Sequence, residues 1–423
     1  MALIDLGAAK IPFPIAIVKI SLYFLIRTNC LSSWHFSGLV LVCAGEVCYI
    51  KHMLKKYLSI ALLLMGIFSI SGCAGGGTSN TEVKTYKIGV ITSLTGTQAE
   101  LGQEQKKILD YRLEDINRNG KYKIELVYED GQCDIAAAEA MRQLLQENLK
   151  FVIGGVCAAA TFAAAPVANG NDMVLLSATT ANEDLEGKNP HVLSLSYPEK
   201  IAAIAVADEL LKYKKFATLS EKTDEAGNLE KMLDDYLYAE KKDSGMVYDQ
   251  KFERGAVDFA SQIKQIQQSG AEALFLNPSS KESSDALLKA LDQAKFSGKL
   301  IGQFSYDNAN LVEEAPAIVN GMVVIDNPTV NSAEFEKYKQ QIINAKGDLP
   351  QMSDYYIAST MDALDILSKL VAENDGDFFS VLNALDTGTF TGYIGKIHFG
   401  GKTFVEGSKA RRQVVASGAL QEG

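Results

Sequence analysis

The sequence predicts an α/β protein with two lobes, each built on a parallel β-sheet that helices cover on both faces. From Tyr86 onward, short runs of β-branched and aromatic residues alternate with amphipathic segments of helical length, which is the pattern of βαβ units. The alternation restarts after Pro198, so the chain holds two such runs. The chain beyond residue 72 is also long enough for two domains with separate cores.

The first run supplies most of one lobe. Its apolar stretches are short and nearly continuous, as strands buried on both faces are, and the segments between them carry apolar residues at helical spacing. The third of these segments is rich in alanine. The sequence therefore predicts strands at 87–92, 123–128, 151–155 and 173–177, and helices at 100–117, 135–147 and 158–168.

The second run supplies the other lobe by the same alternation. It predicts helices at 199–212, 227–241, 258–268 and 283–295, and strands at 216–219, 246–248, 273–276 and 299–304. Two more helices, at 332–345 and 353–373, must then pack on one of the lobes. We expect an N-terminal lobe at 86–197 plus 327–390 and a C-terminal lobe at 198–326 plus 391–423.

An export signal precedes the two lobes. Lys55 and Lys56 are followed by an apolar run and two small residues that lead directly into Cys73. This is the layout of a secretory signal peptide, and Ile-Ser-Gly-Cys resembles the lipobox of bacterial lipoproteins, whose cysteine is lipidated. We expect a lipoprotein signal peptide at 53–72 and a lipid on Cys73. The alternative is an ordinary signal peptide, or a buried helix, with a chance cysteine.

Residues 1–52 are apolar, and a signal peptide belongs at an N-terminus. Two stretches in this segment fall short of the roughly 20 apolar residues that span a membrane. We expect Met53 to be the true start and 1–52 to be an upstream over-translation; a genuine apolar leader in the membrane is the alternative. Residues 73–85 are rich in Gly and Ser and predict a flexible tether. Beyond Lys84 there is no second apolar run of membrane length.

The charge balance bears on the class of partner. The chain carries 52 acidic and 41 basic residues, which gives a net charge of −11. A nucleic-acid-binding protein needs a clustered basic face. We therefore expect no nucleic-acid partner.

Two cysteines, Cys133 and Cys157, lie in the part that forms the lobes. An exported chain meets oxidising surroundings, so the pair predicts a disulfide. Each cysteine follows a predicted strand, and neighbouring parallel strands would bring their ends within bridging distance. Two free buried thiols are the alternative.

Motifs for catalysis are missing from the sequence. The four histidines are scattered, without the His or Cys spacing that holds zinc, and no Gly-x-Ser-x-Gly elbow occurs. Gly400-Gly-Lys-Thr resembles the end of a phosphate loop, but the preceding glycine is one residue out of place, and the segment 393–404 is typical of a β-hairpin. Gly154 and Gly155 lack the third glycine of a dinucleotide loop. We expect no enzyme, no cofactor and no metal.

The start of the alanine-rich helix offers an anion site. Its first residues, Ala158 and Ala159, present backbone N–H groups without partners, and these donors and the helix dipole favour a carboxylate. The polar loop that begins at Ser177 follows the next strand and so lies at the same sheet edge, where ligands of open α/β sheets bind. Thr180 could add a hydroxyl and Ala178 a carbonyl. The alternative is that these residues only cap helices.

Several motifs, in this order, resemble one family. They are Ile88-Gly-Val-Ile-Thr-Ser-Leu-Thr-Gly with Gly102 after it, Tyr128-Glu-Asp-Gly-Gln-Cys-Asp, Phe151-Val-Ile-Gly-Gly-Val-Cys, Leu175-Leu-Ser-Ala-Thr-Thr, Gly321-Met-Val-Val, Tyr355-Tyr-Ile-Ala-Ser-Thr-Met-Asp-Ala-Leu and Gly392-Tyr-Ile-Gly-Lys-Ile-His-Phe. Together they resemble the solute-binding proteins of branched-chain amino acid ABC transporters, which are type I periplasmic binding proteins. The resemblance covers nearly all of the chain from Lys87 onward. It implies two Rossmann-like lobes, joined by three crossings, that close on a ligand like a Venus flytrap.

The resemblance also implies ligand-binding positions and a disulfide. The family has a disulfide at the positions of Cys133 and Cys157. Ala158 falls where a serine hydroxyl often holds the ligand carboxylate, and Ala178 and Thr180 match the loop that supplies a carbonyl and a hydroxyl. Leu101 and Tyr356 match apolar or aromatic walls, and Glu225 and Ser279 fall where aromatic residues are common.

The chain departs from amino-acid binders at the position for the ligand ammonium. Where those proteins place an acidic residue, this chain has Gln303-Phe-Ser-Tyr-Asp, and Phe304 aligns best. Both charges of a desolvated zwitterion need partners. Asp307 or Glu225 would have to replace the missing acid, with Tyr306 beside it; the alternative is that both acids lie on the surface.

The sequence thus predicts a lipid-anchored solute-binding protein of an ABC importer. It would be a monomer that captures an amino acid or a similar small carboxylate and delivers it to a membrane permease with its ATPase. A sensor of the same fold that signals to a partner protein is the first alternative, and an enzyme on this α/β framework is the second. Fold alone does not decide among them.

Overall fold

The computed structural model describes residues 83–423 apart from Thr97, Asn119, 241–244, Ser280, 304–316, Thr329, Asn331 and Gln351, and it leaves out the side chains of Asp224, Glu225, Glu240 and Lys281. Residues Thr81–Gly423 form one compact unit. The predicted signal peptide, Cys73 and the residues before them lie outside the described part, as does most of the tether. Phe304, Tyr306 and Asp307 lie outside it as well.

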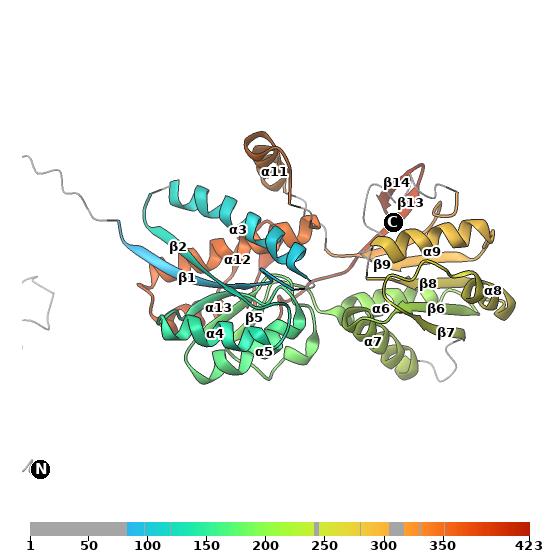
Figure 1. Cartoon of the computed structure of the whole chain (residues 1–423), viewed down its shortest axis with the longest axis horizontal. Helices are drawn as coiled ribbons and strands as arrows, with labels where there is room; N and C mark the ends of the chain where they lie inside the picture. Colours follow the sequence, from blue (N-terminus) through green and yellow to red (C-terminus); the bar gives the residue numbers. More distant parts are fainter. Residues whose placement is uncertain are drawn as a thin grey trace, which may run out of the picture. The chain divides into compact units, whose positions relative to one another are not determined.

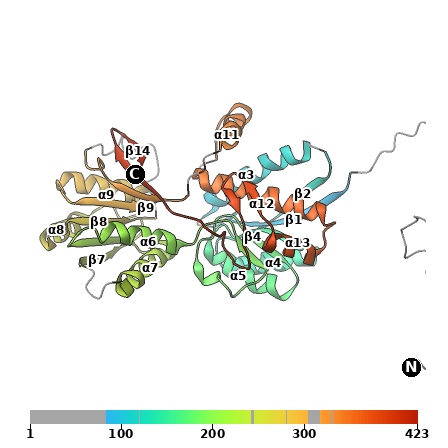
Figure 2. The same cartoon turned by 180° about the vertical axis from the view of Figure 1, so that it is seen from behind.

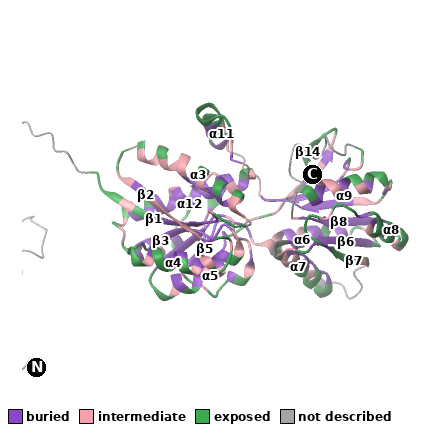
Figure 3. Ribbon diagram, viewed as in Figure 1, coloured by how far each residue is buried: buried purple, intermediate pink, exposed green. Residues whose placement is uncertain are grey.

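The first sheet has five parallel strands in the order β2-β1-β3-β4-β5. Runs of buried Val, Ile and Leu explain why β1, β3 and β4 form central strands with both faces covered, whereas β2, at one edge of the sheet, is mostly half-buried (Figure 3). The strands are β1 (Thr85–Thr92), β2 (Lys123–Asp130), β3 (Phe151–Gly154), β4 (Val174–Ser177) and β5 (Val192–Ser194).

Helices pack on both faces of this sheet (Figure 1). On one face, α4 (Ala136–Gln146) and α5 (Ala158–Gly170) bury apolar side chains against the strands. On the other face lie α3 (Ala99–Arg118) and α12 (Asp354–Glu373), with α13 (Phe378–Thr387) beside them. The helices that follow residue 353 therefore complete the first lobe.

The second sheet has seven strands in the order β14-β13-β10-β9-β8-β6-β7. The strands from β7 to β10 in this order pair parallel, and β13 pairs antiparallel with both of its neighbours, β10 and β14. They are β6 (Phe216–Glu221), β7 (Met246–Phe252), β8 (Ala273–Asn277), β9 (Lys299–Gln303), β10 (Val323–Asp326), β13 (Arg411–Ala416) and β14 (Ala419–Glu422).

This second sheet is also covered on both faces, as the views from the front and from behind show (Figures 1 and 2). The helices α6 (Glu199–Leu210) and α7 (Asp224–Glu240) share one core with it. The helices α8 (Ala260–Ser269) and α9 (Lys281–Gln293) share the other. The fold is thus the expected one: two α/β lobes of the type I periplasmic binding protein class.

The chain crosses between the two sheets three times. The crossings lie between β5 and α6, between β10 and α11 (Ala333–Lys346), and between β12 (Gly395–Ile397) and β13. After the second crossing, α11 packs through Phe335, Tyr338 and Ile342 against α3 and α12. No helix in the described ranges combines the length and the apolar character that a membrane span needs.

The third crossing begins later than the sequence analysis expected. Ile397, Phe399 and Val405, which the predicted boundary at 390/391 assigns to the second lobe, lie in the core of the first lobe. The chain joins the second sheet only at Arg411, the first residue of β13. This part of the predicted boundary is wrong because apolar residues beyond residue 390 complete the core under α12.

The predicted hairpin at 393–404 is displaced toward the N-terminus. Its strands are β11 (Phe390–Gly392) and β12, so its turn lies at Tyr393 and Ile394 and not at the glycine pair 400–401. Asp362 of α12 explains the position, since its buried carboxylate accepts the N–H groups of Tyr393 (2.8 Å) and Ile394 (2.9 Å). A helix residue far away in sequence therefore fixes the turn.

Cys133 and Cys157 form a disulfide with a Cα–Cα distance of 5.4 Å. The sequence analysis predicted this bond by assuming that β2 and β3 are neighbouring strands. They are not neighbours, because β1 lies between them. The loop after β2 crosses this gap through two left-handed residues, Gln132 (φ 48°) and Cys133 (φ 60°). The bond thus joins two loops at the carboxyl edge of the first sheet.

Replacement of both cysteines by serine is expected to lower the free energy of unfolding by about 3 kcal/mol, because the bond closes a loop of 24 residues in the unfolded chain. Urea unfolding with and without a reducing agent measures this. Reduced wild-type protein should match the double variant, and the variant itself should not respond to the reductant. An equal response of both proteins would contradict the prediction.

Candidate functional site

The N-terminus of α5 lies at the carboxyl edge of the first sheet, directly after β3. Its N-cap residue, Cys157, makes no side-chain hydrogen bond to the helix, and its sulfur is in the disulfide. Ala159 is exposed and Ala158 is half-buried. The first N–H groups of the helix thus have no capping side chain, and together with the helix dipole they favour an anion.

Gly155 organises the backbone in front of this helix. It has a left-handed conformation (φ 70°). Its carbonyl oxygen accepts hydrogen bonds from the hydroxyl groups of Thr161 (3.1 Å), Ser177 (3.3 Å) and Thr180 (3.0 Å). These three buried hydroxyls connect β3, α5 and the loop after β4, and hold the two predicted halves of the anion site together.

Thr180 and Ala178 are buried, with exposed fractions of 2% and 1%. The Thr180 hydroxyl lies 2.7 Å from the Thr161 hydroxyl, and its backbone N–H donates to Ser177 Oγ (3.1 Å). In this structure Thr180 therefore orders the loop. Donation from the Thr180 hydroxyl to a ligand carboxylate stays a prediction. It requires the hydroxyl to give up one of its present hydrogen bonds for the ligand.

The loop after β1 is the third part of this edge. Leu101 lies half-buried in the first turn of α3. The helix approaches the strand closely here: a Cβ on Gly102 would lie 2.0 Å from the carbonyl oxygen of Ser93. Only glycine allows this approach, which explains the glycine that the resemblance singled out.

Asp130, the last residue of β2, holds the same loop. Its carboxylate accepts hydrogen bonds from the backbone N–H groups of Leu94 (2.9 Å) and Gln132 (3.1 Å) and from the Thr95 hydroxyl. Burial raises the pKa of Asp130, but these hydrogen bonds outweigh it and hold the pKa below its ordinary value. The sequence analysis quoted Asp130 only as part of a motif and missed this role.

Glu221 plays the corresponding role in the second lobe, and the sequence analysis missed it entirely. It ends β6 and is 1% exposed. Its carboxylate accepts the backbone N–H groups of Gly255 (3.1 Å) and Ser279 (2.6 Å) and the Ser283 hydroxyl (3.1 Å). One buried side chain thus joins the loops that follow β6, β7 and β8.

The predicted ligand residues of the second lobe are only partly described. The Ser279 hydroxyl lies 2.7 Å from the Thr223 hydroxyl. Ser279 donates its backbone N–H to Glu221, and Thr223 lies in the loop that follows Glu221. Glu225 lies in the first turn of α7, and its side chain is outside the description. Phe304, Tyr306 and Asp307 follow β9 directly in the chain but are not among the described residues.

Tyr356 lies at the start of α12, where the N-cap Ser353 accepts the N–H of Tyr356. Its ring is 6.1 Å from that of Tyr355, which in turn is 6.1 Å from that of Tyr197. The Tyr355 hydroxyl donates to the carbonyl of Leu195 (2.8 Å) in the first crossing. The predicted aromatic wall is therefore part of a tyrosine cluster at the crossings.

A small cavity of about 30 Å³ adjoins Tyr356. Its lining comes from the loop after β4 (Ala181), the first crossing and the start of α6 (Tyr197, Glu199), and the ends of β9 (Gln303) and β10 (Asn327). Burial strongly raises the pKa of Tyr197, so this phenol stays protonated at neutral pH. The cavity thus lies where the carboxyl edges of both sheets contribute residues.

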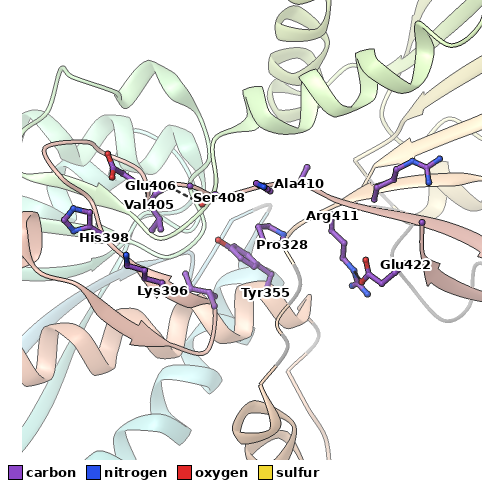
Figure 4. A pocket seen from close by; sticks show the side chains of 15 residues that line it. Pro328, Tyr355, Lys396, His398, Val405, Glu406, Ser408, Ala410, Arg411 and Glu422 are labelled. Atoms are coloured by element: carbon purple, nitrogen blue, oxygen red, sulfur yellow. Dashed lines mark hydrogen bonds and ion pairs between the residues drawn. The ribbon is translucent and has the colours of Figure 1, made fainter.

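A larger depression of about 860 Å³ lies along the third crossing (Figure 4). Lys396, His398, Lys409 and Arg411 contribute to its lining, and Arg411 pairs with Glu422 at 2.7 Å. None of the predicted ligand residues whose side chains the structure describes lines it. This depression therefore belongs to the third crossing, the segment that joins β12 to β13.

The two-lobed α/β architecture, with polar loops and a helix N-terminus without a capping side chain at the carboxyl edges, is typical of proteins that bind small solutes. The sequence profile of the family described as periplasmic binding protein matches residues 85–411. The chain therefore belongs to this family of periplasmic binding proteins.

Relatives with known names are distant in sequence. The Leu/Ile/Val-binding protein of Citrobacter freundii is 21% identical over 315 residues, which are 72% of this chain and 84% of the relative. The leucine-, isoleucine-, valine-, threonine- and alanine-binding protein of Pseudomonas aeruginosa is 21% identical over 354 residues, 79% of this chain and 91% of the relative.

Solved structures share the fold at similar sequence distance. A leucine-binding protein of Thermotoga maritima has a TM-score of 0.64 at 19% identity, covering 80% of this chain and 97% of that chain. A binding protein of Streptococcus pneumoniae in complex with isoleucine has a TM-score of 0.65 at 19% identity, covering 80% and 98%. A binding protein of Rhodopseudomonas palustris in complex with 3,4-dihydroxybenzoic acid has a TM-score of 0.65 at 18% identity, covering 80% and 95%.

Proposed function

We propose that the protein captures an amino acid or a similar small carboxylate between its lobes and delivers it to the permease of an ABC importer, without catalysis. The observation that carries the proposal is the uncapped start of α5, held beside the Thr180 loop by three hydroxyl groups on one carbonyl. This arrangement gives a carboxylate backbone donors and a favourable dipole.

The relatives support a carboxylate as the shared feature of the solute. Those named above bind leucine-type amino acids, and the Rhodopseudomonas palustris protein binds an aromatic acid without an amine. We place the solute against Leu101, Ala158, Ala178, Thr180, Ser279 and Tyr356, with Glu225 and Phe304 as further candidates. The lobes would close by a hinge motion at the three crossings, and a ligand that contacts both lobes would select the closed state.

The remaining predictions belong to the same proposal. Cys73 would carry the lipid that holds the protein at a bacterial membrane, and the N-terminal lobe would begin near residue 86. A sensor that signals without transport is the second candidate, since this fold also serves that role. Permease and ATPase genes beside the gene of this chain favour the importer, and their absence favours the sensor.

Ala158→Asp tests the anion site directly. A carboxylate at the first helical position suits the helix dipole, so the variant should fold at least as well as the wild type. The same charge should repel a bound carboxylate and lower the affinity for the solute by about 100-fold or more.

The measurement has two steps. Mass spectrometry of small molecules released on denaturation identifies the natural solute, and thermal shifts with leucine, isoleucine, valine and 4-hydroxybenzoate rank the candidates. Ala260→Asp, at the first position of α8, is the matched control and should bind like the wild type. Unchanged binding by Ala158→Asp would exclude α5 as the carboxylate site.

A further inference from the structure

The disulfide and the predicted carboxylate site share one residue. Cys157 is the N-cap of α5, and its sulfur is bonded to Cys133 instead of capping the helix. The residue before it, Val156, accepts a hydrogen bond from the Thr179 hydroxyl (2.9 Å) in the loop after β4. A change in the chemistry of the Cys157 sulfur would therefore act directly on the N–H groups at the start of α5.

The disulfide is accessible to a reductant. Both cysteines are half-buried and lie outside the apolar cores of the lobe. The residues on either side of Cys133, Gln132 and Asp134, are exposed, and Ile135 is 84% exposed. The bond thus lies on an open surface loop at the carboxyl edge of the first sheet.

The loop that carries Cys133 has an unfavourable backbone conformation. Gln132 (φ 48°) and Cys133 (φ 60°) are both left-handed, which disfavours residues with a Cβ. The disulfide fixes this loop, because it ties Cys133 to the start of α5. Exposed or strained disulfides are the ones that are reduced readily and that serve in regulation.

Reduction would turn the Cys157 side chain into a capping group. The thiolate of a cysteine at a helix N-terminus is stabilised by the helix dipole and by the N–H groups of the first turn. This thiolate would place a negative charge where the solute carboxylate is proposed to bind, just as Ala158→Asp would one residue later. The thiolate and a bound carboxylate would therefore exclude one another.

We propose that the disulfide between Cys133 and Cys157 is a redox switch for solute binding. A dithiol reductant opens the bond, and the Cys157 thiolate then occupies the start of α5 and displaces the solute carboxylate. The inference rests on the proposed function, since it assumes that the carboxylate binds at α5. It adds to that function a regulation by the redox state of the surroundings.

The thiol–disulfide exchange has a preferred direction. One thiolate of the reductant attacks Cys133 Sγ, the disulfide bond breaks, and Cys157 leaves as a thiolate with the electron pair. Cys157 is the better leaving group because the helix N-terminus stabilises its charge. The second thiol of the reductant then attacks the mixed disulfide and releases Cys133, which takes up the proton of that thiol. Two electrons have passed to the protein, and the reductant ends as a disulfide.

Single-cysteine variants separate the effect of the thiolate from the loss of the bond. Cys133→Ala and Cys157→Ala both remove the disulfide, but only Cys133→Ala leaves a thiolate at the start of α5. Calorimetry of the oxidised wild type, purified from cells that express the full chain, first selects the tightest binder among leucine, isoleucine, valine and 4-hydroxybenzoate as the probe. Cys133→Ala, kept reduced, should bind this probe at least about 10-fold more weakly than the oxidised wild type, whereas Cys157→Ala should stay within about 3-fold.

Solute binding and reduction must influence each other reciprocally. A saturating concentration of the probe should lower the reduction potential of the wild-type disulfide by about 30 mV, which corresponds to a 10-fold difference in affinity. Titration in dithiothreitol redox buffers, followed by alkylation and mass spectrometry, measures this shift. The probe should also slow the alkylation of Cys157 by iodoacetamide in Cys133→Ala about 10-fold and leave that of Cys133 in Cys157→Ala unchanged.

The two single-cysteine variants also decide against the switch if it is wrong. Cys133→Gly is a further variant that suits the left-handed backbone, in case alanine does not fold. An equal or larger loss of affinity in Cys157→Ala would show that the bond acts only through the structure of the loops. Unchanged affinity in both variants would show that the Cys157 sulfur does not reach the carboxylate site. If the oxidised wild type bound none of the four compounds, the proposed function itself would fall, and the switch with it.

Discussion

Gly155→Ala is expected to abolish solute binding and to lower the free energy of unfolding by about 3 kcal/mol or more. Gly155 has a φ of 70°, which costs a residue with a Cβ about 1–2 kcal/mol. A Cβ at this position would also lie 1.9 Å from the Thr161 hydroxyl oxygen and 2.8 Å from its backbone Cα. The backbone atom cannot rotate away, so the loop must move.

This movement would disrupt the site as well as the fold. The Gly155 carbonyl is the common acceptor for Thr161, Ser177 and Thr180. A displaced carbonyl would release the hydroxyls that hold the Thr180 loop against α5. Binding should therefore be lost even at temperatures at which the variant remains folded.

Gly170→Ala is the matched control at the other end of α5. Gly170 is exposed, and apart from its chain neighbours and the backbone of its own helix no described atom lies within 4 Å of the Cβ that the substitution would add. Alanine should stabilise the helix by up to about 1 kcal/mol and leave binding unchanged. Urea unfolding and calorimetry of the two variants test this, and a Gly155→Ala protein that binds like the wild type would contradict the role of the carbonyl.

Glu221→Ala is expected to lower the free energy of unfolding by about 3–5 kcal/mol, because it leaves two backbone N–H groups and one hydroxyl without an acceptor in a buried place. The loops after β6, β7 and β8 would lose their common contact. These loops include Ser279 and lead into Glu225, so solute binding through the second lobe should weaken as well.

Two further variants separate this effect from a loss of charge. Glu221→Gln keeps one acceptor oxygen and should lie between the wild type and Glu221→Ala. Glu253→Ala removes an exposed carboxylate on the same edge, which pairs only with Lys222 among the described residues, and should change stability by less than about 0.5 kcal/mol. Equal stabilities for Glu221→Ala and Glu253→Ala would show that the buried acceptor is dispensable.

The sequence was sufficient for most of the alternation of strands and helices up to residue 303, because those elements have strong local signals, whereas β10, α13, β13 and β14 were not predicted. Buried parallel strands are nearly continuous apolar runs, and the helices between them keep their periodicity. The strand Val192–Ser194 has three residues and was not predicted, since such a short run has no periodicity. It becomes a strand by pairing with β4.

Features that depend on distant contacts could not be derived in this way. The turn at Tyr393 and Ile394 is fixed by Asp362, which lies 31 residues from Tyr393 in the sequence. Glu221 and Asp130 resemble surface acids in the sequence, because nothing local shows that their partners are backbone N–H groups of other loops. The only available signal was an acidic residue shortly after a predicted strand: Asp130 follows the strand predicted at 123–128, and Glu221 follows the strand predicted at 216–219.

The disulfide at the carboxyl edge also bears on how the chain reaches its compartment. Proteins of this family work in the periplasm, whereas the thiols of a nascent chain stay reduced in the cytosol. Until Cys133 and Cys157 pair, the fold lacks a contribution of about 3 kcal/mol, a large fraction of the stability of a typical domain. A nascent chain without this bond unfolds more readily for passage through a translocation channel. Oxidation of the two thiols in the periplasm then forms the disulfide and adds its contribution to the stability of the native state.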